Sequence, residues 1–267
     1  MSILEVKDLH FSYKPGEEIL KGINLTIDQR STAIIGQNGA GKTTFVKLLK
    51  GLLKPTQGDI LLNGKSIKEQ TVAELARHIG MVFQNPNDQI FKNMVLDEVM
   101  FGPLKIGMDK DKARQMALNA LELTGLTDVI NANPYDLGLS RRKLVAIASI
   151  LAMDTEIIIL DEPTIAQDYA GKERIKSIIR KLKADGKTVI TIIHDMNFVA
   201  DVFDRAIVFA KGKAILDDTT KNVFLQKDIL TKAYLEQPDI MKLCLELNFK
   251  EMYLNMEEFI RSNRELL

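Results

Sequence analysis

The pattern of apolar and polar residues in the first third of the chain predicts several strands around one helix. Apolar residues alternate strictly with polar ones over residues 23–27 and more loosely over residues 4–9, as in half-buried strands. Pro15-Gly16 predicts a turn between these segments, and Asn63-Gly64 predicts a hairpin turn further on. Residues 32–35 form a short apolar run that suits a buried strand.

Helical spacing of apolar residues follows in two places. Over residues 43–53 it predicts a helix that Gly51 weakens and Pro55 ends. Residues 86–138 show the same spacing, punctuated by glycine and proline. We therefore expect a helical subdomain inserted into the α/β body.

After Ser140 the chain returns to an α/β alternation. Two segments with helical spacing are each followed by an apolar run, at residues 156–161 and 188–194. This order, with strands that are apolar on both faces, predicts a parallel sheet with right-handed crossovers. A polar, mostly helical tail follows Asp217.

Composition excludes some classes of protein. Of the 267 residues 46% are hydrophobic and 27% charged, so we expect a globular protein with a core of normal size. Lys+Arg and Asp+Glu both number 36, so the chain lacks the basic excess of a protein that coats nucleic acid. Cys244 is the single cysteine and cannot form an intrachain disulfide, which suits a reducing compartment.

Two features bear on membranes. The longest apolar stretch, residues 145–153, is too short to cross a bilayer, which requires about 20 residues. The first residues carry charges where a secretory signal would have an apolar segment. We expect a chain that does not cross a membrane by itself.

A glycine-rich loop follows the strand at residues 32–35 and fits the phosphate-binding pattern G-x-x-x-x-G-K-[ST]. Its glycines let the main chain approach a ligand, and its N–H groups at the positive end of a helix can surround an anion. The lysine supplies charge to the β- and γ-phosphates, and the next threonine offers a hydroxyl to Mg²⁺. The loop consists of Gly36, Gln37, Asn38, Gly39, Ala40, Gly41, Lys42, Thr43 and Thr44.

Polar residues at the ends of two buried strands extend this site. Asp161 is placed to hold the metal, and Glu162 can act as general base on the attacking water. Both could instead be plain loop residues, but the phosphate loop favours the catalytic interpretation. His194 could reach the γ-phosphate, with a capped or solvated loop histidine as the alternative.

On these motifs the chain resembles the nucleotide-binding subunit of ABC transporters, from Leu4 to about Asp218. The resemblance implies an α/β fold: a P-loop NTPase domain of the ABC ATPase type, with an N-terminal antiparallel β subdomain and an inserted helical subdomain at approximately residues 86–153. It implies ATP and Mg²⁺ as cofactors. It also makes Asp161 the metal aspartate, Glu162 the base and His194 the switch histidine.

The resemblance assigns three further residues. Tyr13 matches the aromatic residue that stacks on adenine. Gln84 matches the glutamine that touches Mg²⁺ and links the core to the helical subdomain. Asp168 matches the aspartate of a loop that crosses the dimer interface, although the surrounding residues are unusual.

The chain departs from the family at the signature, Leu-Ser-Gly-Gly-Gln, which contacts ATP on the opposite subunit. The aligned residues are Leu137, Gly138, Leu139, Ser140 and Arg141. Gly138 has no hydroxyl, and Leu139 and Ser140 add side chains where the main chain should approach phosphate. Either this trans site is impaired, or the loop works by another geometry; Ser140 could also simply cap the helix. We expect a heterodimer whose competent site pairs this chain's phosphate loop with a partner's intact signature.

The tail narrows the resemblance. Residues 238–247, 256–260 and 83–91 look like those of energy-coupling factor ATPases, which import vitamins or transition-metal ions. The resemblance implies a second ATPase subunit, a transmembrane coupling protein and a substrate-binding membrane protein, and no nucleic acid. It places the chain at the cytoplasmic face of the cell membrane as a peripheral protein. We expect an ABC ATPase domain at residues 1–218 and a C-terminal helical extension at 219–267 that helps to fasten the dimer.

Two alternatives stay open. The chain could be a soluble ABC ATPase without a transport role, although only 53 positions lead from Gln84 to Leu137, too few for the coiled-coil insertion of chromosome-type relatives. It could instead be a nucleotide-binding regulatory subunit with little hydrolysis. The altered signature favours that alternative, and the intact Asp161-Glu162 pair opposes it.

Overall fold

A computed structural model describes residues 3–249 and 251–263 as an α/β protein with two sheets. The first sheet is antiparallel and contains the N-terminal strands predicted from their alternation. Its order is β2 (Glu18–Ile27), β1 (Leu4–Ser12), β4 (Gln57–Leu62) and β5 (Lys65–Ser66). At the β4–β5 hairpin Asn63 and Gly64 have φ of 49° and 80°, which confirms the predicted turn.

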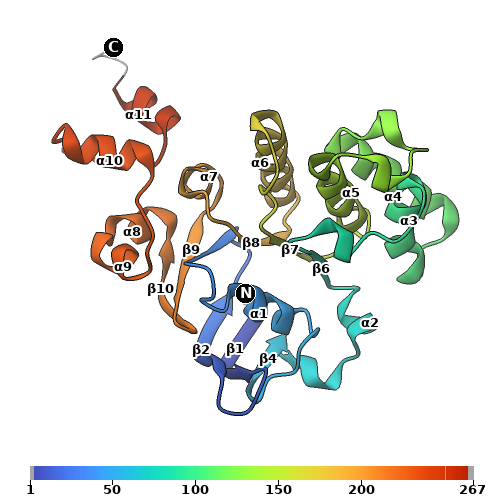
Figure 1. Cartoon of the computed structure of the whole chain (residues 1–267), viewed down its shortest axis with the longest axis horizontal. Helices are drawn as coiled ribbons and strands as arrows, with labels where there is room; N and C mark the ends of the chain where they lie inside the picture. The colour runs from blue at the N-terminus through green and yellow to red at the C-terminus, as the bar shows by residue number, and fades with distance from the viewer. Residues whose placement is uncertain (1–2, 250, 264–267) are drawn as a thin grey trace.

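The second sheet is parallel except for one edge strand, β10, which runs antiparallel to its neighbour. Its order is β10 (Lys213–Thr219), β9 (Arg205–Ala210), β3 (Thr32–Ile35), β8 (Thr188–Ile192), β7 (Ile157–Asp161) and β6 (Ile79–Val82). Figure 1 shows these strands side by side across the middle of the molecule. The order places β3, β8 and β7 together, so that their carboxyl ends share one edge.

The strands of the parallel sheet are buried on both faces, which explains their continuous apolar runs. In β7, Ile157 and Ile159 face one hydrophobic cluster, while Ile158 and Leu160 face another. The first cluster contains α1 (Lys42–Leu49) between this face and the antiparallel sheet. The second cluster contains residues of α3 (Val95–Lys105), α4 (Lys110–Thr124), α5 (Leu139–Leu151), α6 (Tyr169–Ala184) and α7 (Met196–Val202), together with C-terminal residues such as Phe224 and Met241.

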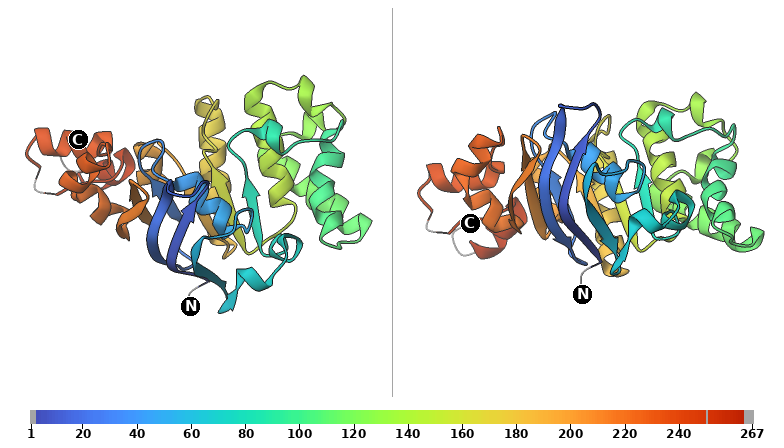
Figure 2. Two further views of the ribbon diagram at one scale, coloured as in Figure 1. Left: turned by 60° about the horizontal axis from the view of Figure 1, so that its bottom comes forward. Right: turned by 90° about the horizontal axis from the view of Figure 1, so that it is seen from below.

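The two additional helical parts lie at opposite ends of the molecule (Figures 1 and 2). Helices α3, α4 and α5 pack on one another at one end, which confirms the inserted helical subdomain. The C-terminal helices begin at Thr220, directly after β10. They are α8 (Thr220–Leu225), α9 (Lys227–Lys232), α10 (Asp239–Glu246) and α11 (Met256–Ser262). Residues 250 and 264–267 of the expected extension lie outside the described residues.

Short elements complete the description. Helix α2 spans Val72–Leu75. Single 3₁₀ turns occur at Ile67–Glu69, Pro86–Asp88, Thr127–Val129 and Pro134–Asp136. None of the helices within residues 3–249 and 251–263 is long and apolar enough to span a bilayer.

The first helix is shorter than its apolar spacing predicts. It ends at Leu49 rather than near residue 53. Gly51 takes a φ of +74°, and the N–H groups of Gly51 and Leu52 donate to the carbonyls of Leu48 and Lys47. The helix thus ends at a glycine whose left-handed conformation lets the following N–H groups bond to the last helix carbonyls. Pro55 therefore lies beyond the stop instead of causing it.

Lys50, just after this helix, is a buried cation. Its Nζ donates to the carbonyl oxygen of Ile79 at 2.5 Å. Burial lowers the pKa of Lys50 from 10.5 to about 8 because the charged form loses its hydration. Between these two pH values the unfolded chain binds a proton that the folded chain has released, so raising the pH stabilises the fold.

We therefore expect the Lys50→Met variant to respond differently to pH from the wild type. Between pH 8 and 10.5 the wild-type free energy of unfolding should rise relative to the variant by up to about 3 kcal/mol. Urea unfolding at pH 7, 8, 9 and 10 measures the difference. The exposed Lys54→Met serves as control and should give a difference that does not depend on pH. A flat profile for Lys50→Met would contradict the burial argument.

Candidate functional site

The phosphate loop leaves β3 and enters α1 in a conformation that requires glycine. Gly36 has a φ of +148°, and a Cβ there would lie 2.2 Å from the carbonyl oxygen of Phe209. Gly41, at the N-cap of α1, has a φ of +97° and no side chain that could cap the helix. The first N–H groups of α1 thus stay available to an anion, as the sequence predicts.

Lys42 is folded back into this loop. Its Nζ donates to the carbonyl oxygens of Gly36 at 2.7 Å and Gln37 at 2.9 Å. Burial lowers the pKa of Lys42, while the negative charges of Glu162 and Asp161 oppose that shift. The ammonium therefore lies between the loop and two acidic groups, where a phosphate would replace main-chain carbonyls as its partner.

Asp161 ends β7 next to the loop. Its side chain is almost fully buried, with 1% exposed, and its Oδ1 lies 3.5 Å from the Oγ1 of Thr43. Burial raises the pKa of Asp161, because the carboxylate loses water. The two residues are 118 positions apart in the chain, and the adjacency of strand ends in the sheet brings them together.

Glu162 connects two of the other predicted site residues. Its Oε2 accepts a hydrogen bond from Nε2 of Gln84 at 3.0 Å, and its Oε1 lies 3.0 Å from Nε2 of His194. Its main chain has a φ of +48°, a left-handed conformation that non-glycine residues seldom adopt. The carboxylate is thus held from two sides at the carboxyl ends of β6, β7 and β8.

Tyr13 lines the same cleft, with its hydroxyl oxygen 3.4 Å from the Oγ1 of Thr44 in the phosphate loop. The residue is 57% exposed, and its ring packs edge-on against Phe11, with 4.8 Å between centroids. An exposed aromatic face beside a phosphate-binding loop can stack on a nucleobase. The cleft has a volume of about 740 Å³. It is lined by Tyr13, Ile19, Asn38, Gly39, Gly41, Lys42, Thr43, Thr44, Gln84, Glu162, Ile165 and His194.

The signature-like residues and Asp168 lie outside this cleft. Gly138 is the N-cap of α5 and offers no side-chain cap, whereas Leu139 is half-exposed. Ser140 does not cap the helix, so that alternative is wrong. Its Oγ donates to Oε1 of Gln167 at 3.0 Å, and the Gln167 Nε2 donates to the Ser140 carbonyl at 3.1 Å.

Asp168 and Arg141 have partners within the chain. Asp168 caps α6, where its Oδ1 accepts from the N–H of Gly171 at 2.7 Å. Arg141 pairs with the exposed Asp128. Leu137 precedes α5, and its carbonyl oxygen accepts from Arg142 at 3.0 Å.

Sequence reasoning missed one buried cation next to the site, Lys143. Its Nζ donates to main-chain carbonyls at the ends of β6 and β7. The available indication was that this lysine lies on the apolar face of a predicted helix. An ammonium group is buried there only if hydrogen-bond acceptors surround it.

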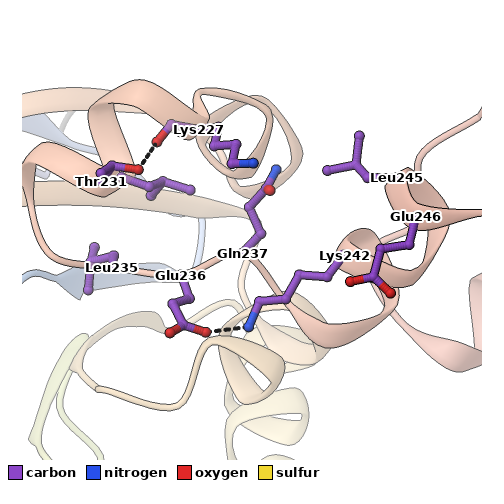
Figure 3. A pocket seen from close by; sticks show the side chains of 9 residues that line it. Lys227, Thr231, Leu235, Glu236, Gln237, Lys242, Leu245 and Glu246 are labelled. Atoms are coloured by element: carbon purple, nitrogen blue, oxygen red, sulfur yellow. Dashed lines mark hydrogen bonds and ion pairs between the residues drawn. The ribbon is translucent and has the colours of Figure 1, made fainter. Parts of the chain in front are cut away.

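A second hollow lies between α9 and α10 (Figure 3). Its volume is about 330 Å³, and its charged groups are partly paired with each other, as the ion pair between Lys242 and Glu236 shows. Its remaining lining is a mixture of leucine, threonine and amide side chains. It offers neither a glycine-rich loop nor a strand-end carboxylate, and the cleft around Lys42 remains the candidate site.

Residues 20–165 match the ABC transporter family. This is more than half of the chain and includes the phosphate loop, Gln84, Asp161 and Glu162. The chain belongs to the ABC transporter family. As a member it is an ABC-type ATPase, which couples ATP hydrolysis to transport.

Relatives of this ABC ATPase extend over nearly the whole chain. It is 39% identical to the energy-coupling factor transporter ATP-binding protein EcfA of Methanocaldococcus jannaschii, over 94% of this chain and 91% of that protein. It is 37% identical to a putative ABC transporter ATP-binding protein of Pyrococcus furiosus, over 97% of this chain and 98% of the relative. The resemblance to energy-coupling factor ATPases is thereby confirmed.

Solved structures show the same fold. The cbiO1 protein of Clostridium perfringens, part of the ABC transporter complex cbiONQ, superimposes with a TM-score of 0.77 at 33% identity. The match covers 93% of this ABC ATPase and 99% of cbiO1. A dimeric ATP-binding cassette in a post-hydrolysis state, bound to ADP and phosphate, gives a TM-score of 0.75 at 30% identity over 81% of this chain and 98% of that cassette.

Proposed function

We propose that this chain is the ATP-hydrolysing subunit of an energy-coupling factor type importer for a vitamin or metal micronutrient. One observation carries the hydrolytic part of the proposal: a single cleft contains the phosphate loop and the Gln84–Glu162–His194 arrangement. The relatives named energy-coupling factor ATP-binding protein support the type of importer.

The cleft would bind ATP along its length. Tyr13 would stack on the base, the N–H groups of residues 36–44 would hold the phosphates, and Lys42 would move from the loop carbonyls to the β- and γ-phosphates. In each case a group of this chain that is exposed, or that is bonded to another group of the loop, would gain a part of the nucleotide as its partner.

The oxygen donors beside the loop fit Mg²⁺. The Thr43 hydroxyl and the Asp161 carboxylate are hard ligands only 3.5 Å apart, and the Gln84 amide approaches from β6. These three residues would hold the ion, which supplies neutralisation of the charge that develops on the phosphates. Burial makes the Asp161 carboxylate costly without a cation, as its raised pKa reflects.

Glu162 would accept a proton from the attacking water, and His194 would hold that carboxylate and reach toward the γ-phosphate. Phosphoryl transfer needs positioning and charge stabilisation more than covalent chemistry, and these residues are of the types that provide both. We expect the γ-phosphate to need groups from a second subunit as well, since none of the signature-like residues of this chain lines the cleft.

The partner subunit would be a different ABC ATPase. This chain presents Gly138 where the family places a serine hydroxyl and the half-exposed Leu139 where it places a glycine, and Ser140 is already bonded to Gln167. Its signature would therefore serve the partner's ATP poorly, while its own phosphate loop would pair with an intact signature. The two ATP molecules bound in such a heterodimer would then be hydrolysed at unequal rates.

The remaining partners would be a transmembrane coupling protein and a substrate-binding membrane protein, with the chain peripheral at the cytoplasmic face. The similarity to a protein that is part of the cbiONQ complex supports a membrane assembly. The C-terminal helices, whose residues Leu243, Leu247, Met256 and Ile260 are partly exposed, would help to fasten the ATPase dimer.

We expect the purified full-length chain to hydrolyse ATP at least about 10-fold more slowly than the complex co-purified from membranes, because it lacks a competent signature. Its triple variant Gly138→Ser/Leu139→Gly/Ser140→Gly should recover turnover on its own. A Cβ at Gly138 meets nothing within 4 Å, so the serine fits. Initial rates at increasing protein concentration measure both. Brisk, cooperative turnover by the unaltered chain would contradict the heterodimer, and ATP binding without hydrolysis in the membrane complex would favour a regulatory subunit.

A further inference from the structure

Lys143 is an almost completely buried cation. It lies in the second turn of α5, in the helical subdomain, and only 1% of its surface is accessible. Its Nζ donates to the carbonyl oxygens of Phe83 at 2.8 Å, Gln84 at 2.6 Å and Asp161 at 3.1 Å. An ammonium group has three protons, and these three acceptors use all of them.

The acceptors are neutral main-chain groups from two strand ends. Phe83 and Gln84 directly follow β6, and Asp161 is the last residue of β7. Burying an ammonium is costly, and an apolar side chain of similar volume would often serve packing as well or better. We therefore infer that the positive charge of Lys143 serves to fix these carbonyls relative to α5.

Two of the three carbonyls belong to residues whose side chains enter the proposed metal site. Holding a carbonyl oxygen restrains ψ of its residue and thereby the local main chain from which the Gln84 amide and the Asp161 carboxylate project. Groups that orient metal ligands commonly affect metal affinity by about 10- to 100-fold.

We propose that Lys143 is a positioning residue that aims Gln84 and Asp161 at the Mg²⁺ of bound ATP. The proposal rests on the proposed ATPase function and adds a residue to it. It also links α5, through the Lys143 side chain, to the main chain beside the metal site, and the same helix begins at the signature-like residues.

A matched control is available at the same junction. Arg174, on α6, donates from Nη1 to the carbonyl oxygen of Thr124 at 2.8 Å, and its guanidinium lies against Gly125. This contact also ties the helical subdomain to the core, but neither residue lines the cleft. Loss of Arg174 therefore loosens the junction without touching Gln84 or Asp161.

The test measures the Mg²⁺ dependence of ATP binding by the full-length chain, using a fluorescent ATP analogue. In the Lys143→Met variant the Mg²⁺ concentration for half-maximal binding should rise about 10-fold. Affinity for the nucleotide in EDTA should change less than about 2-fold, since the phosphate loop is intact. Arg174→Ala should stay near the wild type, because neither Arg174 nor Thr124 lines the cleft.

The outcomes separate the two proposals. An unchanged Mg²⁺ dependence in Lys143→Met, or an equal shift in Arg174→Ala, would overturn the positioning role. Wild-type protein that binds ATP without any Mg²⁺ dependence would instead contradict the metal site itself. If Lys143→Met does not fold, as judged by its thermal transition, Lys143→Gln replaces it with the same expected shift.

Discussion

Replacement of Glu162 by glutamine should leave ATP binding intact and slow hydrolysis by about 100-fold or more. Glutamine has the same shape, so the side chain can keep its place between Gln84 and His194, which now lie 3.0 Å from its two oxygens. The amide cannot accept a proton from water. The expected result is therefore a loss of turnover without a loss of affinity.

The measurement uses the complex isolated from membranes, with single-turnover hydrolysis and nucleotide binding determined on the same preparation. Glu156→Gln is the matched control, because Glu156 is exposed and directly precedes β7 at the end opposite Glu162. It should hydrolyse ATP at the wild-type rate. Unchanged turnover in Glu162→Gln would remove this residue from the role of base.

The Lys42→Ala variant should bind ATP about 100-fold more weakly, a loss of about 2.7 kcal/mol. Charge-assisted hydrogen bonds to phosphate are among the stronger contacts in proteins, and Lys42 is the cation of the phosphate loop. The alanine variant also leaves the carbonyls of Gly36 and Gln37 without their present donor. Part of the loss should thus come from a loop that holds its shape less well.

Isothermal titration with ATP and with AMP separates these effects. AMP lacks the β- and γ-phosphates, so its affinity should fall far less than that of ATP. Lys54→Ala, an exposed lysine that does not line the cleft, should leave both affinities unchanged. Intact ATP affinity in Lys42→Ala would argue against the assignment of the phosphate loop.

Much of the fold could be predicted from local patterns. The apolar run of β7 indicated burial on both faces, and its residues do alternate between two hydrophobic clusters. The proximity of Asp161 and Thr43 could also be anticipated, because carboxyl ends of neighbouring parallel strands share an edge and the phosphate loop starts from one of them. The resemblance to a known family supplied Tyr13 and Gln84, which spacing alone would not have singled out. The structure brings these residues into one cleft, and their roles stay predictions.

Other features depend on contacts that local patterns do not encode. Helix α1 was expected to continue past Gly51, because apolar spacing does not register a left-handed residue. Ser140 was considered as a cap, yet its partner is Gln167, 27 positions away. The acceptors of Lys143 likewise come from two separate strand ends. Each of these assignments requires the tertiary arrangement.

The two hydrogen-bond partners of Glu162 connect its carboxylate to the ends of two different strands. Both carboxylate oxygens are engaged, by Gln84 and by His194. Each oxygen keeps a further lone pair, so an attacking water would bind without displacing either partner. Because Gln84 follows β6 and His194 follows β8, a shift of one strand end against the other would tilt the carboxylate away from that water and slow the consumption of ATP.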